Sequence, residues 1–200
     1  MVRGLGSLPP KIARVMESVP RHRFVPDVLR KEAYEDTPLP LANDRSTISA
    51  PHMVAFQLDW ADLGPGLRVL EIGSGSGYLL ALAANLTSPG GQIVGVELDE
   101  ELAEGSRDIL NQLGYGTAVT VATADGRAGW PDQAPYDRIL VSCATPEVFP
   151  AWLDQLATPG ILVAPVGSPF DQILRRLRRS LGLERWQDGP ECRFVSLVGR

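Results

Sequence analysis

Arg-Val-Leu-Glu-Ile-Gly-Ser-Gly-Ser-Gly, residues 68–77, is the stretch of sequence that decides the fold. Residues 68–72 are largely apolar and contain no breaker, which predicts a short buried strand. Gly73, Gly75 and Gly77 follow, and residues 78–84 are rich in good helix formers. A strand, a glycine turn and a helix start in this order point free backbone N–H groups at a ligand. We therefore expect a small cofactor at this turn.

The turn does not match the common phosphate-binding motifs. A dinucleotide fingerprint needs a glycine where this chain has Tyr78, and a P-loop ends in Gly-Lys-Ser/Thr, which is missing here. The acid before the turn, Glu71, suits a ligand with a positive group better than a pyrophosphate. S-adenosylmethionine fits this requirement, because it carries a sulfonium and an ammonium group and no phosphate. The alternative is a turn whose glycines serve packing alone.

Two later apolar segments also end in acids. Residues 93–97 end in Glu97, 20 residues beyond Gly77, and residues 119–124 are followed by Asp125. An acid in the position of Glu97 can accept hydrogen bonds from both ribose hydroxyls. Three successive strands that end in acids around one glycine turn indicate a nucleoside-containing ligand more specifically than the turn alone.

Composition limits the class of protein. The 200 residues suit one domain with a substantial core, and a net charge of −5 disfavours general nucleic-acid binding. Residues 72–96 are uncharged, but their dense apolar part, 78–86, is too short to span a bilayer. The first residues have no long apolar run, so we expect no signal peptide and a cytoplasmic protein.

The two cysteines, Cys143 and Cys192, favour two free thiols over a disulfide in an intracellular protein. The two histidines and two cysteines show no metal-ligand spacing, so we expect no metal site.

The order of the predicted elements indicates an α/β fold. We expect helices at 9–19, 28–34, 47–60, 78–86, 100–113 and 150–156, a loop at 35–46, and strands at 68–72, 93–97, 119–123, 136–142 and 161–164. Strands that alternate with helices imply a mainly parallel sheet with helices on both faces. Ligands of such sheets bind beyond the carboxyl ends of the strands, where the glycine turn and the acids lie.

The C-terminal part departs from this alternation. Residues 173–183 predict a helix with leucines on one side and arginines largely on the other, and residues 191–198 predict a last strand. The arginines form either a solvated face or an electrostatic guide for an acidic peptide.

Ser49 allows two interpretations. It precedes Pro51 at the expected start of a helix, which is typical of an N-cap. A catalytic Ser49–His52 pair is the other possibility, but no nucleophile-elbow glycines flank Ser49 and no acid is evident to orient His52.

Several segments resemble the protein-L-isoaspartate O-methyltransferase family over nearly the whole chain. The connector at 20–26, Thr-Ile-Ser-Ala-Pro-His-Met at 47–53 and Leu-Glu-Ile-Gly-Ser-Gly-Ser-Gly-Tyr at 70–78 are similar to its connector, signature segment and methyl-donor motif. Further segments recur in the order of the family: 125–126, 129–130, 134–139, 155–156, 159–160 and 165–167. The signature segment is the specific part, because fold alone does not define the substrate.

The resemblance implies a Rossmann-like S-adenosylmethionine-dependent methyltransferase fold in a single domain. Residues 1–60 would form an N-terminal helical and substrate-binding segment, 61–167 the donor-binding core, and 168–200 a C-terminal helix and last strand. The implied activity is methyl transfer from S-adenosyl-L-methionine to the α-carboxylate of L-isoaspartyl residues in peptides and proteins. The ester then passes through a succinimide, which leads to repair.

The resemblance also implies the site residues. Ser49 would be the active-site residue and a positioner, and Thr47, Ile48 and Ser49 would contact the substrate. Glu97 would hold the ribose, and Asp125 with Gly126 the adenine. The full set expected at the donor is Ser46, Thr47, Glu71, Gly73, Ser74, Gly75, Gly77, Glu97, Leu98, Asp125 and Gly126.

Three departures from the family pattern keep a second function open. Asp-Arg-Ser at 44–46 replaces the usual Gly-Gln before the signature, Ser196 stands where the last strand usually has proline, and the segment after Val166 is rich in arginine. Related enzymes methylate an ordinary aspartate of one dedicated peptide to form an aspartimide, and this is the alternative. A non-catalytic donor-binding module and a small-molecule methyltransferase are further alternatives. For both functions that modify a polypeptide, we expect a monomer that acts on an isoaspartyl- or aspartyl-containing peptide or protein. We expect it to bind neither nucleic acid nor a membrane.

Overall fold

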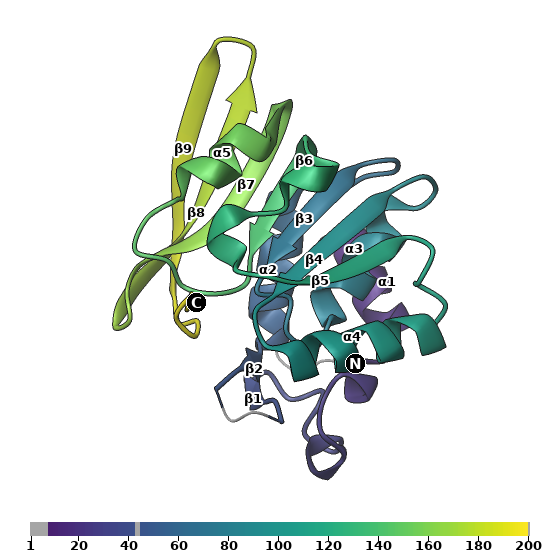
Figure 1. The fold of residues 1–200 in the computed structure, drawn as a ribbon. Coiled ribbons are helices and arrows are strands. Elements are labelled where there is room, and N and C mark those ends of the chain that lie inside the picture. The colour runs from purple at the N-terminus through teal and green to yellow at the C-terminus, as the bar shows by residue number, and fades with distance from the viewer. Residues whose placement is uncertain (1–7, 43–44, 200) are drawn as a thin grey trace.

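The computed structural model describes residues 8–42 and 45–199 (Figure 1). The expectation about a signal peptide concerns a segment that lies largely outside these residues. A seven-stranded sheet forms the centre, in the order β5-β4-β3-β6-β7-β8-β9. The first five of these strands are parallel and the last two antiparallel, so the predicted, mainly parallel α/β sheet is confirmed.

The central strand, β3, lies at the point where the strand order reverses. From β3 the chain runs outward through β4 and β5, then crosses back to β6 and β7 on the other side of β3. Ligands bind beyond the carboxyl ends of strands at such a switch point, so the topology favours the glycine turn after β3 as a site. The strands of the large sheet are β3 Arg68–Ile72, β4 Gln92–Glu97, β5 Val119–Thr123, β6 Tyr136–Val141, β7 Leu156–Ser168, β8 Asp171–Ser180 and β9 Leu183–Cys192.

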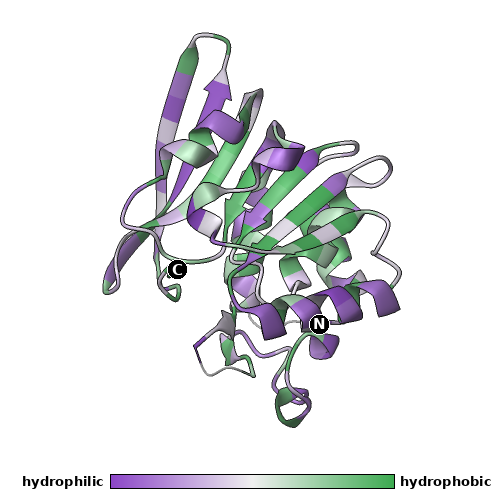
Figure 2. Ribbon diagram, in the orientation of Figure 1, coloured by the Kyte–Doolittle hydropathy of each residue, from purple (hydrophilic) through white to green (hydrophobic). Residues whose placement is uncertain are grey.

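The helices form two layers around the sheet. Apolar side chains of α1, α2, α3 and α4 share one core cluster with β3, β4 and β5, while α5 packs in a second cluster on the other face. Right-handed crossovers explain this division, because the chain reverses its direction across the sheet after β5. Figure 2 shows apolar residues concentrated on the central strands, and hydrophilic residues along much of β8, β9 and α4. The helices are α1 Pro10–Ser18, α2 Pro51–Ala61, α3 Tyr78–Thr87, α4 Glu100–Gln112 and α5 Pro150–Gln155, with 3-10 helices η1 Arg21–Arg23, η2 Asp27–Leu29, η3 Gly126–Ala128 and η4 Pro131–Gln133.

The N-terminal predictions are partly wrong. The first predicted helix is confirmed as α1, whereas the segment predicted as a second helix at 28–34 contains only the end of η2 followed by turns. The helix expected to open at residue 47 begins at Pro51, because β2 (Thr47–Ile48) pairs with β1 (Leu39–Pro40). This small pair occupies part of the segment predicted as a loop, and it fixes the path of the signature segment.

The predicted C-terminal helix at 173–183 is wrong, because β8 and β9 form an antiparallel hairpin there. The leucines that suggested one helical face are divided between the two faces of the sheet: Leu174 belongs to the core cluster with α2, and Leu177 to the cluster with α5. Gly182, with a φ of +71°, lies in the turn that ends the run. Ion pairs link the arginines across the hairpin, Arg175 with Asp188 and Arg179 with Glu184.

The last strand was also predicted too late in the sequence, since β9 ends at Cys192. The chain after β9 returns to the carboxyl end of β6. Ala144 donates its N–H to the Val195 carbonyl (2.8 Å), and Leu197 donates to the Ala144 carbonyl (2.7 Å). This return places residues 193–197 beside the edge of the sheet where the glycine turn lies.

Both cysteines are free thiols, as predicted. In the described part of the chain, each helix is too short or too polar to cross a membrane. The same residues contain no group of three or more histidine, cysteine or acidic side chains that could hold a metal ion.

Candidate functional site: two adjoining cavities

The glycine turn adopts a backbone that only glycine takes readily. Gly73, Gly75 and Gly77 have φ values of +74°, +51° and +82°. A Cβ atom on Gly77 would lie 2.7 Å from the Ser106 hydroxyl and 3.1 Å from Leu110, both on α4. The turn therefore lies directly against α4, so its glycines serve packing as well as ligand approach.

We expect Gly77→Ala to lower the free energy of unfolding by about 2 kcal/mol, because the new side chain meets both a left-handed backbone and a filled contact. Denaturant unfolding measures this loss. Gly105→Ala is the matched control, since Gly105 lies inside α4 with open space around it, and alanine should stabilise the helix slightly. Equal effects of the two substitutions would contradict this account of the turn.

Glu97, at the end of β4, holds the turn in place. Its Oε2 accepts the N–H of Gly75 (2.8 Å), and its Oε1 accepts those of Leu98 (2.8 Å) and Asp99 (3.0 Å). A carboxylate offers about four acceptor sites on its two oxygens, so Oε1 is fully used and Oε2 can still take one hydroxyl donor from a ligand.

Glu71 is almost completely buried in β3. Burial raises its pKa to about 8, the hydrogen bond from Ser142 opposes this shift, and the negative charge of Glu97 adds to it. The Ser142 hydroxyl donates to Oε1 (2.7 Å), whereas Oε2 is buried and has no partner among the described residues. A buried carboxyl group with one oxygen unsatisfied suits a cationic ligand group, so the residues present fit the positive head of S-adenosylmethionine.

A small cavity of about 40 Å³ opens beside Glu71 and the turn. It brings together five of the predicted donor residues, Thr47, Glu71, Gly73, Ser74 and Gly75, with two of the predicted substrate residues, Ile48 and Ser49. Its remaining lining residues are Val54, Gln57, Ser76, Tyr78, Leu79 and Ser142. The cavity is too small for a nucleoside and matches a compact polar head group.

A larger cavity of about 390 Å³ lies next to it, between the signature segment and the returning C-terminal chain. It is lined by Pro38, Thr47, Ser49, Ala50, His52, Met53, Ser142, Glu191, Cys192, Arg193, Phe194 and Val195. The two cavities share Thr47, Ser49 and Ser142. These three hydroxyl side chains therefore mark the boundary between a head-group cavity and a space that can take a peptide.

The remaining predicted donor residues lie outside both cavities. Gly77 faces α4, Glu97 is the last residue of β4, and Leu98 directly follows that strand. Ser46 precedes β2, and its carbonyl accepts the N–H of Leu41 (2.9 Å). Their roles toward a ligand stay predictions.

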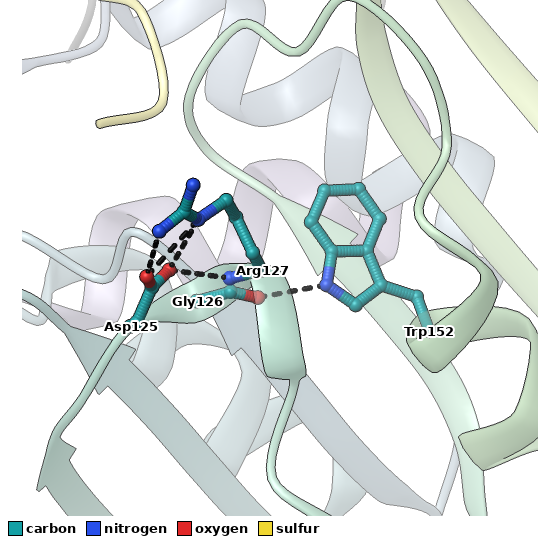
Figure 3. A network of polar contacts seen from close by, with 4 residues as sticks. All are labelled: Asp125, Gly126, Arg127 and Trp152. Atoms are coloured by element: carbon teal, nitrogen blue, oxygen red, sulfur yellow. Dashed lines mark hydrogen bonds and ion pairs between the residues drawn. The ribbon is translucent and has the colours of Figure 1, made fainter. Parts of the chain in front are cut away.

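Asp125 and Gly126 lie beyond the end of β5, where Figure 3 shows how they are anchored. The Asp125 carboxylate accepts the backbone N–H of Arg127 (3.0 Å) and is paired with its guanidinium. The Gly126 carbonyl accepts the indole N–H of the fully buried Trp152 (2.7 Å). These contacts anchor the tip, and a ligand at Asp125 would share the carboxylate with Arg127.

Ser49 is not the N-cap of α2, so that interpretation is wrong. Ala50 occupies the cap position, and the Asp36 carboxylate accepts the His52 N–H (2.9 Å) from outside the helix. The same Asp36 oxygen lies 2.9 Å from His52 Nδ1. No hydrogen bond joins Ser49 to His52 within the described ranges, so the ring is oriented by Asp36 and not by a nucleophile.

Ser142, Gln57 and the C-terminal lining residues were not predicted from the sequence. Ser142 had an available signal, because it is the last residue of the strand predicted at 136–142 and must lie at the same edge as the glycine turn. The residues of 191–195 had none, since they reach the site only through the unpredicted return of the chain after β9.

Comparisons with known proteins agree on one family. The profile of the family described as Protein-L-isoaspartate(D-aspartate) O-methyltransferase matches residues 5–200. A protein-L-isoaspartate O-methyltransferase of Hyperthermus butylicus is 44% identical over 94% of this chain and 81% of the relative. One of Methanococcoides burtonii is 42% identical over 95% of this chain and 93% of the relative.

Solved structures agree on the fold. A protein-L-isoaspartate O-methyltransferase superposes with a TM-score of 0.86 at 28% identity, and the match covers 96% of this chain and 62% of that one. A Plasmodium falciparum protein crystallised with S-adenosyl-L-homocysteine superposes with a TM-score of 0.84 at 24% identity. This match covers 96% of this chain and 92% of that chain, and at such an identity it shows a similar fold and no more. With a family profile that spans nearly all of its length, and curated relatives above 40% identity, this chain belongs to the protein-L-isoaspartate O-methyltransferase family.

Proposed function

We propose that this chain transfers the methyl group of S-adenosyl-L-methionine to the α-carboxylate of L-isoaspartyl residues in peptides and proteins. The observation that carries the proposal is the shared boundary of the two cavities. Thr47, Ser49 and Ser142 line both the head-group cavity beside the glycine turn and the larger cavity beside the C-terminal chain. A donor in the first and a peptide in the second would meet at these hydroxyl groups.

On the donor side, the unpartnered oxygen of Glu71 and the backbone amides of 73–75 would hold the methionyl head. Glu97 would hold the ribose, and Asp125 with Gly126 the adenine. The bound donor supplies an electrophilic methyl group on a sulfonium.

On the acceptor side, the chain does not need a strong base. A carboxylic acid with a pKa near ~4 is already ionised at pH 7 and is itself the nucleophile. The protein must hold it in line and exclude water, and such orientation can supply ~7–11 kcal/mol of the barrier. The Ser49 hydroxyl has no hydrogen-bond partner among the described residues and lines both cavities, so we assign it the role of positioning the carboxylate.

The methyl ester formed in this step is more reactive than the carboxylate. The adjacent backbone nitrogen displaces methanol and closes a succinimide, whose hydrolysis returns part of the residue to normal aspartate. Repair then follows from the chemistry of the ester after release.

Incubation with labelled donor and paired peptides that differ only in one aspartyl or isoaspartyl linkage tests this function. We expect label in the isoaspartyl peptide and its loss as methanol in mild base. Preference for the normal linkage would reject repair and favour the dedicated aspartimide-forming alternative. Donor binding without transfer to either peptide would indicate a non-catalytic module.

We expect Ser49→Ala to lower kcat by about 10- to 100-fold, because a hydrogen bond to a charged group contributes about 1.5–3 kcal/mol. The affinity for S-adenosylhomocysteine, measured by calorimetry, should change less than threefold. Ser180→Ala, in the exposed end of β8, is the control and should leave both quantities unchanged. A large loss of donor affinity in Ser49→Ala would mean that Ser49 is chiefly structural.

We propose further that the protein acts in the cytoplasm as a monomer, on polypeptide substrates rather than on nucleic acid or membranes. Two free thiols and a net charge of −5 support this assignment. Sedimentation at micromolar concentration tests the oligomeric state.

A further inference from the structure

Three buried polar atoms around the head-group cavity have no hydrogen-bond partner among the described residues: Gln57 Oε1, Glu71 Oε2 and Ser74 Oγ. Glu71 and Ser74 belong to the donor motif, whereas Gln57 comes from α2 in the N-terminal segment. Burying a polar group without a partner costs free energy, so native structures satisfy nearly all such groups. Three of them around one cavity indicate that a ligand group satisfies them.

The orientation of the Gln57 amide follows from its other contact. Gln57 is fully buried, and its Nε2 donates to the Val141 carbonyl (3.0 Å) at the end of β6. A carbonyl can only accept, so the NH₂ group must face Val141, and Oε1 is the atom left for the cavity. Val141 immediately precedes Ser142, so the same contact holds the strand end from which Ser142 donates to Glu71.

The chemistry of the three atoms selects the occupant. Gln57 Oε1 can only accept hydrogen bonds, ionised Glu71 can only accept them, and the Ser74 hydroxyl can do either. A group that donates several hydrogen bonds and carries positive charge satisfies all three. An ammonium group has three N–H donors and fits about 40 Å³, and its positive charge favours the ionised form of Glu71, whereas a water molecule donates only two hydrogen bonds and carries no charge.

We propose that Gln57 is a positioning residue of the donor site, whose Oε1 accepts a hydrogen bond from the α-ammonium group of S-adenosylmethionine beside Glu71. This inference rests on the donor assigned in the proposed function. It gives the N-terminal segment a direct part in donor binding, through the same helix that carries His52 and Met53 to the larger cavity.

Calorimetry with two ligands tests the proposal: S-adenosylhomocysteine, and its deaminated analogue in which hydrogen replaces the amino group. Gln57→Met keeps the size of the side chain and removes both polar atoms. We expect this variant to bind S-adenosylhomocysteine at least tenfold more weakly than the wild type. This is the loss of affinity that follows when one hydrogen bond to a charged group is removed. The analogue, which lacks the ammonium, should bind to both proteins with equal affinity.

Two results would overturn the proposal: an unchanged affinity of Gln57→Met for S-adenosylhomocysteine, or an equal loss of affinity for both ligands, which would make Gln57 merely structural.

Gln57→Glu keeps an acceptor oxygen and should lose less affinity than Gln57→Met, and it serves as the second variant if methionine prevents folding. Gln172→Met is the control, because Gln172 is a buried glutamine outside the head-group cavity with both amide atoms bonded to Phe194. It should change stability and leave both affinities unchanged. No acceptor peptide is present, so a failure here is distinct from a failure of methyl transfer.

Discussion

At pH 9 the Glu71→Gln variant is expected to be more stable than the wild-type chain, by an amount on the order of 5 kcal/mol, and at pH 5 the two should be similar. This difference in stability follows from the pKa of Glu71, which burial raises from its ordinary value of 4.5 to about 8. Each pKa unit corresponds to about 1.4 kcal/mol. An uncharged amide of the same shape has no proton to lose.

The sign of the effect follows from proton binding. Between pH 4.5 and 8 the folded chain keeps the Glu71 proton, whereas the unfolded chain has already released it. Stability falls with pH wherever the folded state binds more protons, so this group destabilises the fold progressively over that window. Above pH 8 the full cost is present and the dependence on Glu71 levels off.

Urea unfolding of both proteins from pH 5 to 9, without ligand, measures this difference. Glu191→Gln, which removes an exposed glutamate, is the control and should leave the pH dependence of the wild type intact. A difference between wild type and Glu71→Gln that stays constant with pH would contradict the protonated, buried state of Glu71.

Glu97→Ala should have the second large effect, on ligand binding and stability together. Its carboxylate accepts three backbone N–H groups of the turn and of the start of α4, which would lose their partner. We expect the free energy of unfolding to fall by ~2–4 kcal/mol. The affinity for S-adenosylhomocysteine should fall at least ~10-fold, because the hydrogen bond that a ribose hydroxyl would donate to Glu97 in the proposed function is lost as well.

Glu97→Gln separates the two parts of this effect. The amide keeps one acceptor oxygen for the turn but places an NH₂ group where the other oxygen stood, so it should restore part of the stability and little of the affinity. Thermal unfolding and calorimetry measure these quantities. Full affinity in a folded Glu97→Ala protein would remove Glu97 from the donor site.

The parallel core was predictable from sequence because its signals are local. The apolar run at 68–72, the glycines after it and the acids at residues 97 and 125 each depend on a strand and the turn that follows it. Parallel strands bring their carboxyl ends to one edge, so the approximate position of the site followed without knowledge of distant contacts.

The hairpin of β8 and β9 was not predictable in the same way. Leucines at helical spacing suit a helix with one buried side, but a strand inside a sheet buries both faces, so Leu174 and Leu177 serve opposite cores. Gly182, near the end of the predicted helix, was a turn signal, but the spacing of the leucines outweighed it. The path of the chain after Cys192 depends on its contacts with Ala144, which no local pattern encodes.

The placement of Gln57 beside Glu71 at the head-group cavity was not predictable, for a related reason. Gln57 lies in a helix whose start was predicted too early, and its partner strand is 84 residues away in the sequence at Val141. Only the packing of α2 against the strand ends brings the amide to the head-group cavity.

A crystal structure of the protein with S-adenosylhomocysteine and an isoaspartyl peptide would test most directly whether the two cavities meet at Thr47, Ser49 and Ser142. We expect the homocysteine ammonium beside Glu71 and Gln57, and the isoaspartyl α-carboxylate on the Ser49 hydroxyl, facing the sulfur. A peptide bound away from these hydroxyl groups, or a homocysteine moiety outside the cavity at Glu71, would contradict the account.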